Sequence, residues 1–366
     1  MISKTKSKVF TLQTRFQNEI QTFYITGMKG NNLKKFLLFS FTPDTTIREE
    51  IYFDSLRLGL FFLVIMCISF AVGSLLLNQF LEPVRNLSLG MKALEQRCFD
   101  HKIPIINRDE LGRLSDTFNQ IMEGLADLEV ARVVQDAFFP REILSANGWE
   151  VYGTCTPASR VGGDYFDYFL VDENKIAVIV GDVSGHGVSA ALVVAMAKAL
   201  IAHPANEFNP SKIFNMIDKI FSETLKRRKM MTCFFGIIDI IEGKFLASNA
   251  GHNYPFILSG EKAEHISFPG FPLGVNSRRK YQVSEINLNE NDCMIFYTDG
   301  FIEAFDRNGV SIGYPKVKNA LPALLKNSAF ETENALREWH RSIARPGPLD
   351  DDITLVVVQK RLTHPL

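Results

Sequence analysis

The sequence has few cysteines, no excess of charge of either sign and no secretion signal. Its 366 residues include 5 cysteines, which are scattered and form neither a disulfide pattern nor a CxxC metal motif. With 40 basic and 41 acidic residues, the formal net charge is −1, which argues against a nucleic-acid partner. A charged region, an apolar region and a cleavage site do not follow one another at the start, so no signal peptide is predicted.

Carboxylates occur where apolar strands are predicted to end. Asp182 follows the run Ile176–Val180 and precedes a glycine-rich turn, after which a buried helix is predicted over Ser189–His203. The alternative is that Asp182 only caps this helix. Three further acidic residues have similar positions: Asp164 after two glycines, Asp299 after the run Cys293–Tyr297, and Asp351 before the run Ile353–Val358.

Several carboxylates buried together would repel one another unless a cation neutralised them. The available ligands are oxygens, and no His or Cys pair has zinc spacing, which favours a hard ion such as Mg²⁺ or Mn²⁺. The pattern therefore predicts a divalent metal site at the ends of the strands.

Five ordered motifs carry a family resemblance. GGDYFD, GDVSGHG, NAGH, YTDGFIEA and DDIT, between Gly162 and Thr354, resemble the PPM-type metal-dependent protein serine/threonine phosphatases, specifically their SpoIIE/RsbU-like branch. The resemblance implies an α+β fold, in which two antiparallel sheets pack face to face as a β-sandwich flanked by helices. It also implies that the site lies at one end of the sandwich.

The same resemblance implies roles for particular residues. Asp182 would bridge two Mn²⁺ or Mg²⁺ ions, and the backbone carbonyl of Val183 would bind one of them. Asp299 and Asp351 would complete the coordination of the second ion, while Asp164 would hold a metal or a metal-bound water. Two such ions activate water for phosphate ester hydrolysis, so Asp164 and Asp182 are the candidate catalytic residues and no covalent intermediate is expected.

Other polar residues of the motifs are expected to support the site rather than to react. His186 and His252 are predicted to brace loops by hydrogen bonds, and the alternative for each is a role as general acid. Supporting or surface positions are predicted for Asp167, Asp350 and Asp352. Arg160 is a less favoured candidate for a phosphate contact, because this branch typically lacks the phosphate-binding arginine of its eukaryotic relatives.

The run Leu58–Leu77 carries no charge, and at about 1.5 Å per residue it matches a hydrocarbon core of about 30 Å. It predicts a transmembrane helix, with a buried helix of a soluble protein as the alternative.

Apolar residues spaced by three and four then follow Pro83 and recur after the DELG sequence at Asp109–Gly112. This arrangement resembles a HAMP domain, a parallel four-helix coiled coil in a homodimer, and the alternative is an ordinary helical linker.

The predicted order of domains follows from these features. The heptad pattern breaks at Arg132 and Gln135, although the helix is predicted to continue to Phe139, before Pro140. The resemblance implies that the helix Leu128–Phe139 is a switch that carries changes in HAMP packing to the site, and the alternative is a passive spacer. The domains are an extracytoplasmic or remnant sensor segment at 1–57, a transmembrane helix at 58–77, a HAMP domain at 78–129, a switch or linker helix at 130–145 and a phosphatase domain at 146–362.

The sequence thus predicts a single-pass, dimeric phosphatase of the bacterial cytoplasmic membrane, with its catalytic domain in the cytoplasm. By resemblance, its substrate is a phosphoserine or phosphothreonine on an anti-anti-sigma (STAS) protein. One alternative is a non-catalytic receptor whose phosphatase-like domain only binds a signalling partner. Another is a metal-dependent phosphodiesterase acting on a nucleotide.

Overall fold

The computed structural model describes residues 9–16, 19–29, 37–202, 208–275, 280–289 and 291–360. Parts of the predicted segment 1–57, His203 of the predicted helix and residues 361–362 of the predicted phosphatase domain lie outside the described residues. The chain divides into two compact units, Met1–Met122 and Glu123–Leu366.

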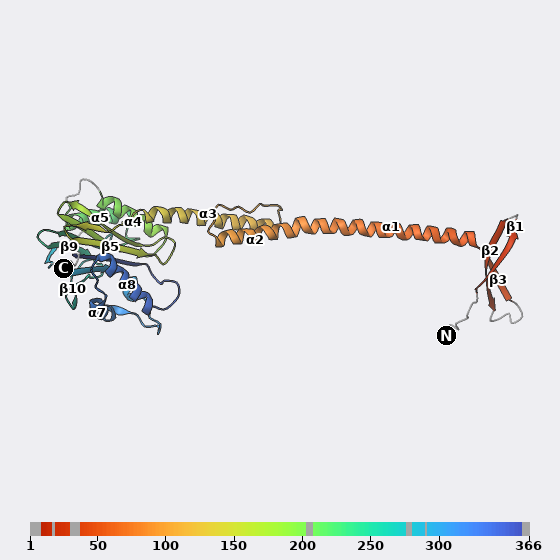
Figure 1. Ribbon diagram of the computed structural model, residues 1–366. Helices are drawn as coiled ribbons and strands as arrows, with labels where there is room; N and C mark the ends of the chain where they lie inside the picture. The colour runs from red at the N-terminus through yellow and green to blue at the C-terminus, as the bar shows by residue number, and fades with distance from the viewer. Residues whose placement is uncertain are drawn as a thin grey trace. The chain divides into compact units, whose positions relative to one another are not determined.

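The first unit begins with a small antiparallel sheet of three strands in the order β1-β2-β3 (Figure 1). The strands are β1 (Val9–Phe16), β2 (Glu19–Lys29) and β3 (Leu37–Pro43). No sheet was predicted here, because these strands mix polar and apolar residues.

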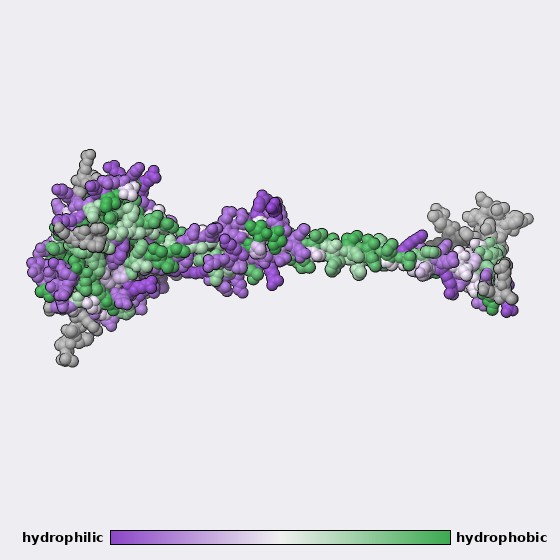
Figure 2. Space-filling view, turned by 90° about the horizontal axis from the view of Figure 1, so that it is seen from above, coloured by the Kyte–Doolittle hydropathy of each residue, from purple (hydrophilic) through white to green (hydrophobic). Residues whose placement is uncertain are grey.

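A long helical run follows this sheet and contains the predicted transmembrane span. It comprises α1 (Asp44–Leu76), a π-helical turn (Leu77–Leu81) and α2 (Glu82–Glu95). Its most apolar window has a mean hydropathy of 2.7 and no buried residue, so the helix is long and apolar enough to cross a membrane. Figure 2 shows the apolar side chains of α1 as a nearly continuous surface. The alternative of a buried helix in a soluble core does not match this exposure.

The connector between α2 and α3 (Glu110–Asp136) contacts both helices. Ile103 of the connector is buried, and both its backbone N–H and its carbonyl bond to the side chain of Asn119, each at 2.8 Å. A Cβ at Gly90 would lie 2.5 Å from the Ile103 side chain, so glycine lets the connector approach α2. Several of the predicted heptad residues nevertheless stay exposed: Val84, Met91, Leu114 and Ile121.

Helix α3 continues without a break past Leu128 and ends at Asp136, earlier than the predicted end at Phe139. The short strand β4 (Leu144–Ala146) then falls within the stretch predicted as a linker. It was not predicted because three residues give too short a pattern to detect.

The second unit is a sandwich of two antiparallel sheets, which confirms the predicted fold class. Their orders are β11-β10-β13-β14-β5-β4 and β12-β9-β8-β7-β6. The strands not yet given are β5 (Trp149–Thr156), β6 (Asp164–Asp172), β7 (Lys175–Val183), β8 (Met231–Asp239), β9 (Lys244–Ala250), β10 (Phe256–Ser259), β11 (Lys262–His265), β12 (Ser284–Asn287), β13 (Asp292–Tyr297) and β14 (Ile353–Lys360).

Aromatic and branched side chains from both sheets fill the space between them, including Phe166, Phe234 and Phe296. Helices α4 (Val188–Ile201) and α5 (Pro210–Thr224) cover the outer face of the five-stranded sheet. The outer face of the other sheet is covered by α6 (Asp299–Glu303), α7 (Gly313–Leu324) and α8 (Ala329–Ile343) (Figure 1).

Candidate active site

The two candidate catalytic carboxylates lie opposite each other on neighbouring strands. Asp164 is the first residue of β6, and the antiparallel register pairs it with Asp182 near the end of β7. Asp164 is buried and Asp182 is partly buried. The strand pairing therefore brings together two residues that the sequence separates by a whole hairpin.

Asp164 also connects the two sheets. Its Oδ2 accepts hydrogen bonds from the hydroxyls of Thr298, at 2.8 Å, and Thr354, at 2.6 Å. These threonines follow β13 and lie in β14, both in the opposite sheet. Burial and then the charge of Asp182 raise the pKa of Asp164 well above its usual value, and the two threonine hydrogen bonds partly oppose this. Neither threonine was singled out from the sequence, although both lie within the quoted motifs.

Asp182 is influenced by three carboxylates that lie at the ends of two other strands. Its pKa is raised to about 7 by burial first, then by the charges of Asp299, Asp351 and Asp352, and is lowered by Lys229. The pKa of Asp299 is also raised, by burial and then by Asp351. The structure thus brings the four predicted carboxylates, Asp164, Asp182, Asp299 and Asp351, to one end of the sandwich.

Gly163 allows the backbone to close around this site. A Cβ at Gly163 would lie 2.8 Å from the Val183 carbonyl and 2.9 Å from the Gly185 carbonyl. Asp352 accepts hydrogen bonds from the backbone N–H groups of Ala158, at 2.7 Å, and Gly163, at 2.6 Å. Its buried carboxylate therefore holds the loop before β6, which fits the supporting position predicted for it.

The remaining candidates lie in contacts away from the four carboxylates. Asp167 pairs with Lys198 at 2.6 Å, and Asp350 pairs with Arg345 at 2.5 Å. Arg160 lies 3.8 Å from Glu129, while His186 is in the exposed part of the turn after β7. The ion pairs of Asp167, Asp350 and Arg160 are thus with partners other than the four carboxylates.

His252 is buried, and its hydrogen-bond partners Thr232 and Asn249 are uncharged. Its Nδ1 lies 2.9 Å from the hydroxyl of Thr232, and its backbone N–H donates to the side-chain oxygen of Asn249 at 2.7 Å. Burial lowers the pKa of His252 to about 4. Thr232 pairs with Asp182 in the sheet, so the imidazole supports the strand beside the site. This arrangement fits the bracing role predicted for His252.

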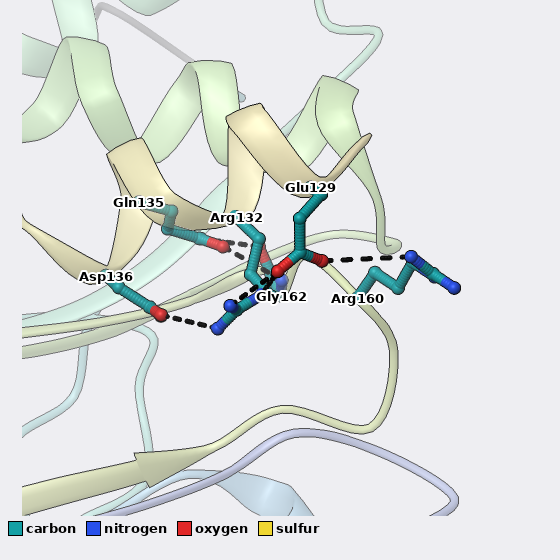
Figure 3. Close-up of polar contacts among 6 residues, drawn as sticks. All are labelled: Glu129, Arg132, Gln135, Asp136, Arg160 and Gly162. Carbon is teal, nitrogen blue, oxygen red and sulfur yellow. Dashed lines mark hydrogen bonds and ion pairs between the residues drawn. The ribbon is translucent and has the colours of Figure 1, made fainter. Parts of the chain in front are cut away.

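The end of α3 contacts the loop that precedes Asp164 (Figure 3). The buried side chain of Gln135 donates to the Gly162 carbonyl at 2.9 Å and accepts from the Gly162 N–H at 3.1 Å. One turn earlier, Arg132 donates to both Glu129 and Asp136. The signal for this contact was the heptad break itself, because Arg132 and Gln135 are polar where the pattern called for apolar residues.

The carboxylates fit a hard divalent ion that keeps part of its water shell. Within the residues that the structure describes, no three Asp, Glu, His or Cys side chains lie close enough to hold a metal by themselves. However, Mg²⁺ and similar ions commonly keep several waters and use only a few protein oxygens. Burial, followed by the charges of Asp299, Asp351 and Asp352, raises the pKa of Asp182, so several carboxylates lie near one another here, as expected for a cation site.

The fold and this acidic site define a PPM-type phosphatase domain, and comparison with protein families agrees. Residues 172–361 match the model of the family described as Stage II sporulation protein E (SpoIIE), and residues 75–127 match the HAMP domain. The first match covers more than half of the chain. The chain therefore belongs to the SpoIIE family, and it carries a HAMP domain ahead of its phosphatase domain.

Relatives with curated names are distant in sequence. Protein IcfG of Synechocystis sp. is 26% identical over 297 residues, which cover 69% of this chain and 46% of that protein. Phosphoserine phosphatase RsbU of Bacillus subtilis is 22% identical over 240 residues, covering 65% of this chain and 71% of RsbU. The chain thus matches less than half the length of IcfG.

Solved structures show the same fold. The SiaA-PP2C domain of Pseudomonas aeruginosa has a TM-score of 0.57 at 21% identity, covering 66% of this chain and 98% of that one. The RsbU and RsbW domains of Rv1364c from Mycobacterium tuberculosis have a TM-score of 0.52 at 24% identity, covering 60% of this chain and 61% of that one.

Metal binding is expected to strengthen as the pH rises from 6 to 8. With a pKa of about 7, Asp182 is mostly protonated at pH 6, and a metal ion must displace this proton. Ionisation of this one group predicts an apparent Mn²⁺ affinity about tenfold higher at pH 8 than at pH 6. Calorimetric Mn²⁺ titrations at pH 6, 7 and 8 measure this change. An affinity that is constant over this range would show that proton release from Asp182 is not coupled to metal binding.

Proposed function

We propose that this chain is a membrane-bound signalling phosphatase that hydrolyses phosphoserine or phosphothreonine with two Mn²⁺ or Mg²⁺ ions. The observation that carries the proposal is the convergence of Asp164, Asp182, Asp299 and Asp351 at one end of a PPM-type sandwich. Asp182, Asp299, Asp351 and the Val183 carbonyl would hold the ions, with Asp164 beside them. When bound, such ions supply an activated water and neutralise charge on the phosphate.

The protein's own residues position these groups. Thr298 and Thr354 both bond to Oδ2 of Asp164, which fixes the orientation of this carboxylate. The backbone pairing of β6 with β7 fixes its position relative to Asp182. Because the threonines belong to the other sheet, sliding of one sheet against the other would misplace Asp164.

We propose that the substrate is a phosphorylated STAS-type anti-anti-sigma protein. Support comes from membership of the SpoIIE family and from the similarity to a protein named phosphoserine phosphatase RsbU. The experiment incubates the full chain and Mn²⁺ with phosphorylated STAS proteins of the same organism, and phosphate-affinity gels measure the phosphorylated fraction. The proposal predicts loss of phosphate from at least one STAS protein. If other phosphoserine proteins are dephosphorylated and every STAS protein stays phosphorylated, this substrate class is wrong.

The membrane and dimer proposals rest on exposed apolar side chains. Helix α1 is long and apolar enough to cross a membrane, and we propose that it spans the bacterial cytoplasmic membrane once, with the catalytic domain in the cytoplasm. Met91, Leu114 and Ile121 are exposed on the HAMP helices, where a second copy would cover them. Cross-linking between copies that carry a cysteine at Ile121 tests the homodimer. Absence of a cross-linked species in membranes would contradict it.

The contact between Gln135 and Gly162 suggests how α3 regulates the site. Helix α3 begins in the region matched by the HAMP domain, and its end holds the backbone two residues before Asp164. We propose that changes in HAMP packing act on catalysis by moving Gln135, so that the loop carrying Asp164 is either held in place or released.

Replacement of Gln135 by leucine is expected to lower phosphatase activity of the full chain about tenfold. Leucine keeps the volume but leaves the buried N–H and carbonyl of Gly162 without their partner, which costs about 1–3 kcal/mol and loosens the loop. Initial rates with p-nitrophenyl phosphate measure the effect.

The matched control is Gln120→Leu in the same helix, because the Gln120 side chain contacts only Asp116 of its own helix among the described residues. This variant should keep wild-type activity. Equal activities of the two variants would show that the contact with Gly162 does not influence catalysis.

A further inference from the structure

A lysine outside the five sequence motifs is held against the turn that follows Asp182. Lys229 precedes β8, and its Nζ donates to the Ser184 carbonyl at 2.6 Å. The next residue, Met230, reinforces this contact through its backbone. The Ser184 N–H donates to the Met230 carbonyl at 2.9 Å, and the Met230 N–H donates to the Ser184 hydroxyl at 3.1 Å. Three hydrogen bonds therefore fix the position of Lys229 beside the site.

The ammonium of Lys229 lies close to the exposed part of this turn. A Cβ built on Gly185 would be 3.1 Å from Nζ, and Gly185 itself is exposed. An ammonium has three N–H donors, and among the described residues the bond to Ser184 is the one contact shown for this group. Donors thus remain for a ligand at the edge of the acidic site.

A fixed cation at this position has an electrostatic consequence. It repels divalent metal ions, so it does not help to bind them, but it attracts an anion that binds beside them. Lys229 also ends a basic run, in which Lys226, Arg227 and Arg228 are exposed. The backbone of Lys226 and Arg227 has positive φ angles of 49° and 63°, which ends α5 before this run.

We propose that Lys229 binds the phosphate group of the substrate. The proposal rests on the proposed phosphatase function and adds to it a residue that recognises the anion. Held by the Ser184 carbonyl, the ammonium is already ordered before the substrate arrives, so less conformational entropy is lost on binding. A lysine acts on phosphate as a point charge, in contrast to the two-pronged contact of an arginine.

The test uses the full chain in detergent and compares Lys229→Met with Lys229→Arg. Methionine keeps much of the side-chain volume without the charge. We expect the inhibition constant of inorganic phosphate and the KM for p-nitrophenyl phosphate to rise about tenfold in Lys229→Met. Lys229→Arg should recover most of this loss, because it keeps the charge and a donor for Ser184. The Mn²⁺ concentration for half-maximal activity should stay the same or fall. Arg228→Met, at an exposed neighbour, is the control and should change neither constant more than about twofold.

Two results would overturn the proposal. Unchanged phosphate inhibition in Lys229→Met would exclude a contact with phosphate. A higher Mn²⁺ requirement with unchanged phosphate inhibition would mean that Lys229 only positions the turn. Calorimetry of inorganic phosphate binding to the Mn²⁺-loaded protein gives a readout that does not need turnover. If wild type binds phosphate but hydrolyses nothing, the proposed function fails while the role of Lys229 is still measured by the same comparison.

Discussion

Replacement of Asp182 by asparagine is expected to lower kcat by about a thousandfold or more, without unfolding the protein. The amide keeps the shape of the side chain but removes the charge that Mg²⁺ and Mn²⁺ prefer in an oxygen ligand. Losing an interaction on which activation of the nucleophile depends typically costs several kcal/mol of transition-state stabilisation. Hydrolysis of p-nitrophenyl phosphate at saturating Mn²⁺ measures the change.

The pKa of Asp182 adds a second expectation for this variant. The pKa of Asp182 is about 7 in the folded protein and lies near its usual, lower value in the unfolded chain. As the pH rises between these two values, ionisation of Asp182 therefore lowers the free energy of unfolding. In EDTA at pH 7.5, Asp182→Asn should therefore melt at the same temperature as wild type or higher. Asp172→Asn, at the exposed end of β6, is the control and should keep full activity. An Asp182→Asn variant with wild-type kcat would exclude Asp182 from catalysis.

Replacement of Gly163 by alanine is expected to lower activity at least about a hundredfold and to raise the Mn²⁺ requirement. The added methyl would lie 2.8 Å from the Val183 carbonyl and 2.9 Å from the Gly185 carbonyl, distances that real Cβ atoms essentially never show. Both neighbours are backbone atoms, so the turn after Asp182 must move. Such a movement displaces the carbonyl proposed to bind a metal ion. Mn²⁺ titrations of activity and of calorimetric binding measure the effect.

Gly124→Ala is the matched control, because a Cβ at Gly124 meets nothing within 4 Å and the residue lies inside α3. Alanine there should leave the Mn²⁺ requirement unchanged and slightly stabilise the helix. Melting temperatures in EDTA separate a local effect of Gly163→Ala from general unfolding. If Gly163→Ala folds and binds Mn²⁺ as wild type does, the Val183 carbonyl is not a metal ligand.

Much of the sandwich could be predicted because its strands are continuous apolar runs that end at an acidic residue. The runs before Asp182 and Asp299 correspond to β7 and β13, and the run after Asp351 corresponds to β14. The register of Asp164 with Asp182 could not be predicted, because pairing between strands depends on the whole sheet. The hydrogen bonds of Thr298 and Thr354 to Asp164 depend in turn on how one sheet packs on the other.

The polar contacts of α3 and of the loop before β8 could not be predicted for a related reason. A broken heptad indicates only that the helix face changes its neighbour, and it does not identify the partner of Gln135 as Gly162. Lys229 lies in a basic run that has no periodicity, and its contact with Ser184 arises from the alignment of β7 with β8. The three-stranded sheet at the N-terminus was missed because its strands do not alternate clearly between polar and apolar residues.

The measurement that tests the central claim most directly is hydrolysis of a phosphoserine peptide by the full chain with Mn²⁺, with Mg²⁺ and with EDTA. Asp182→Asn is measured beside wild type in each condition. We predict phosphate release that requires a divalent ion, stops in EDTA and is lost in Asp182→Asn. If wild type binds Mn²⁺ but releases no phosphate in any condition, with or without reconstitution into membranes, the chain is a non-catalytic receptor and the proposed function is wrong.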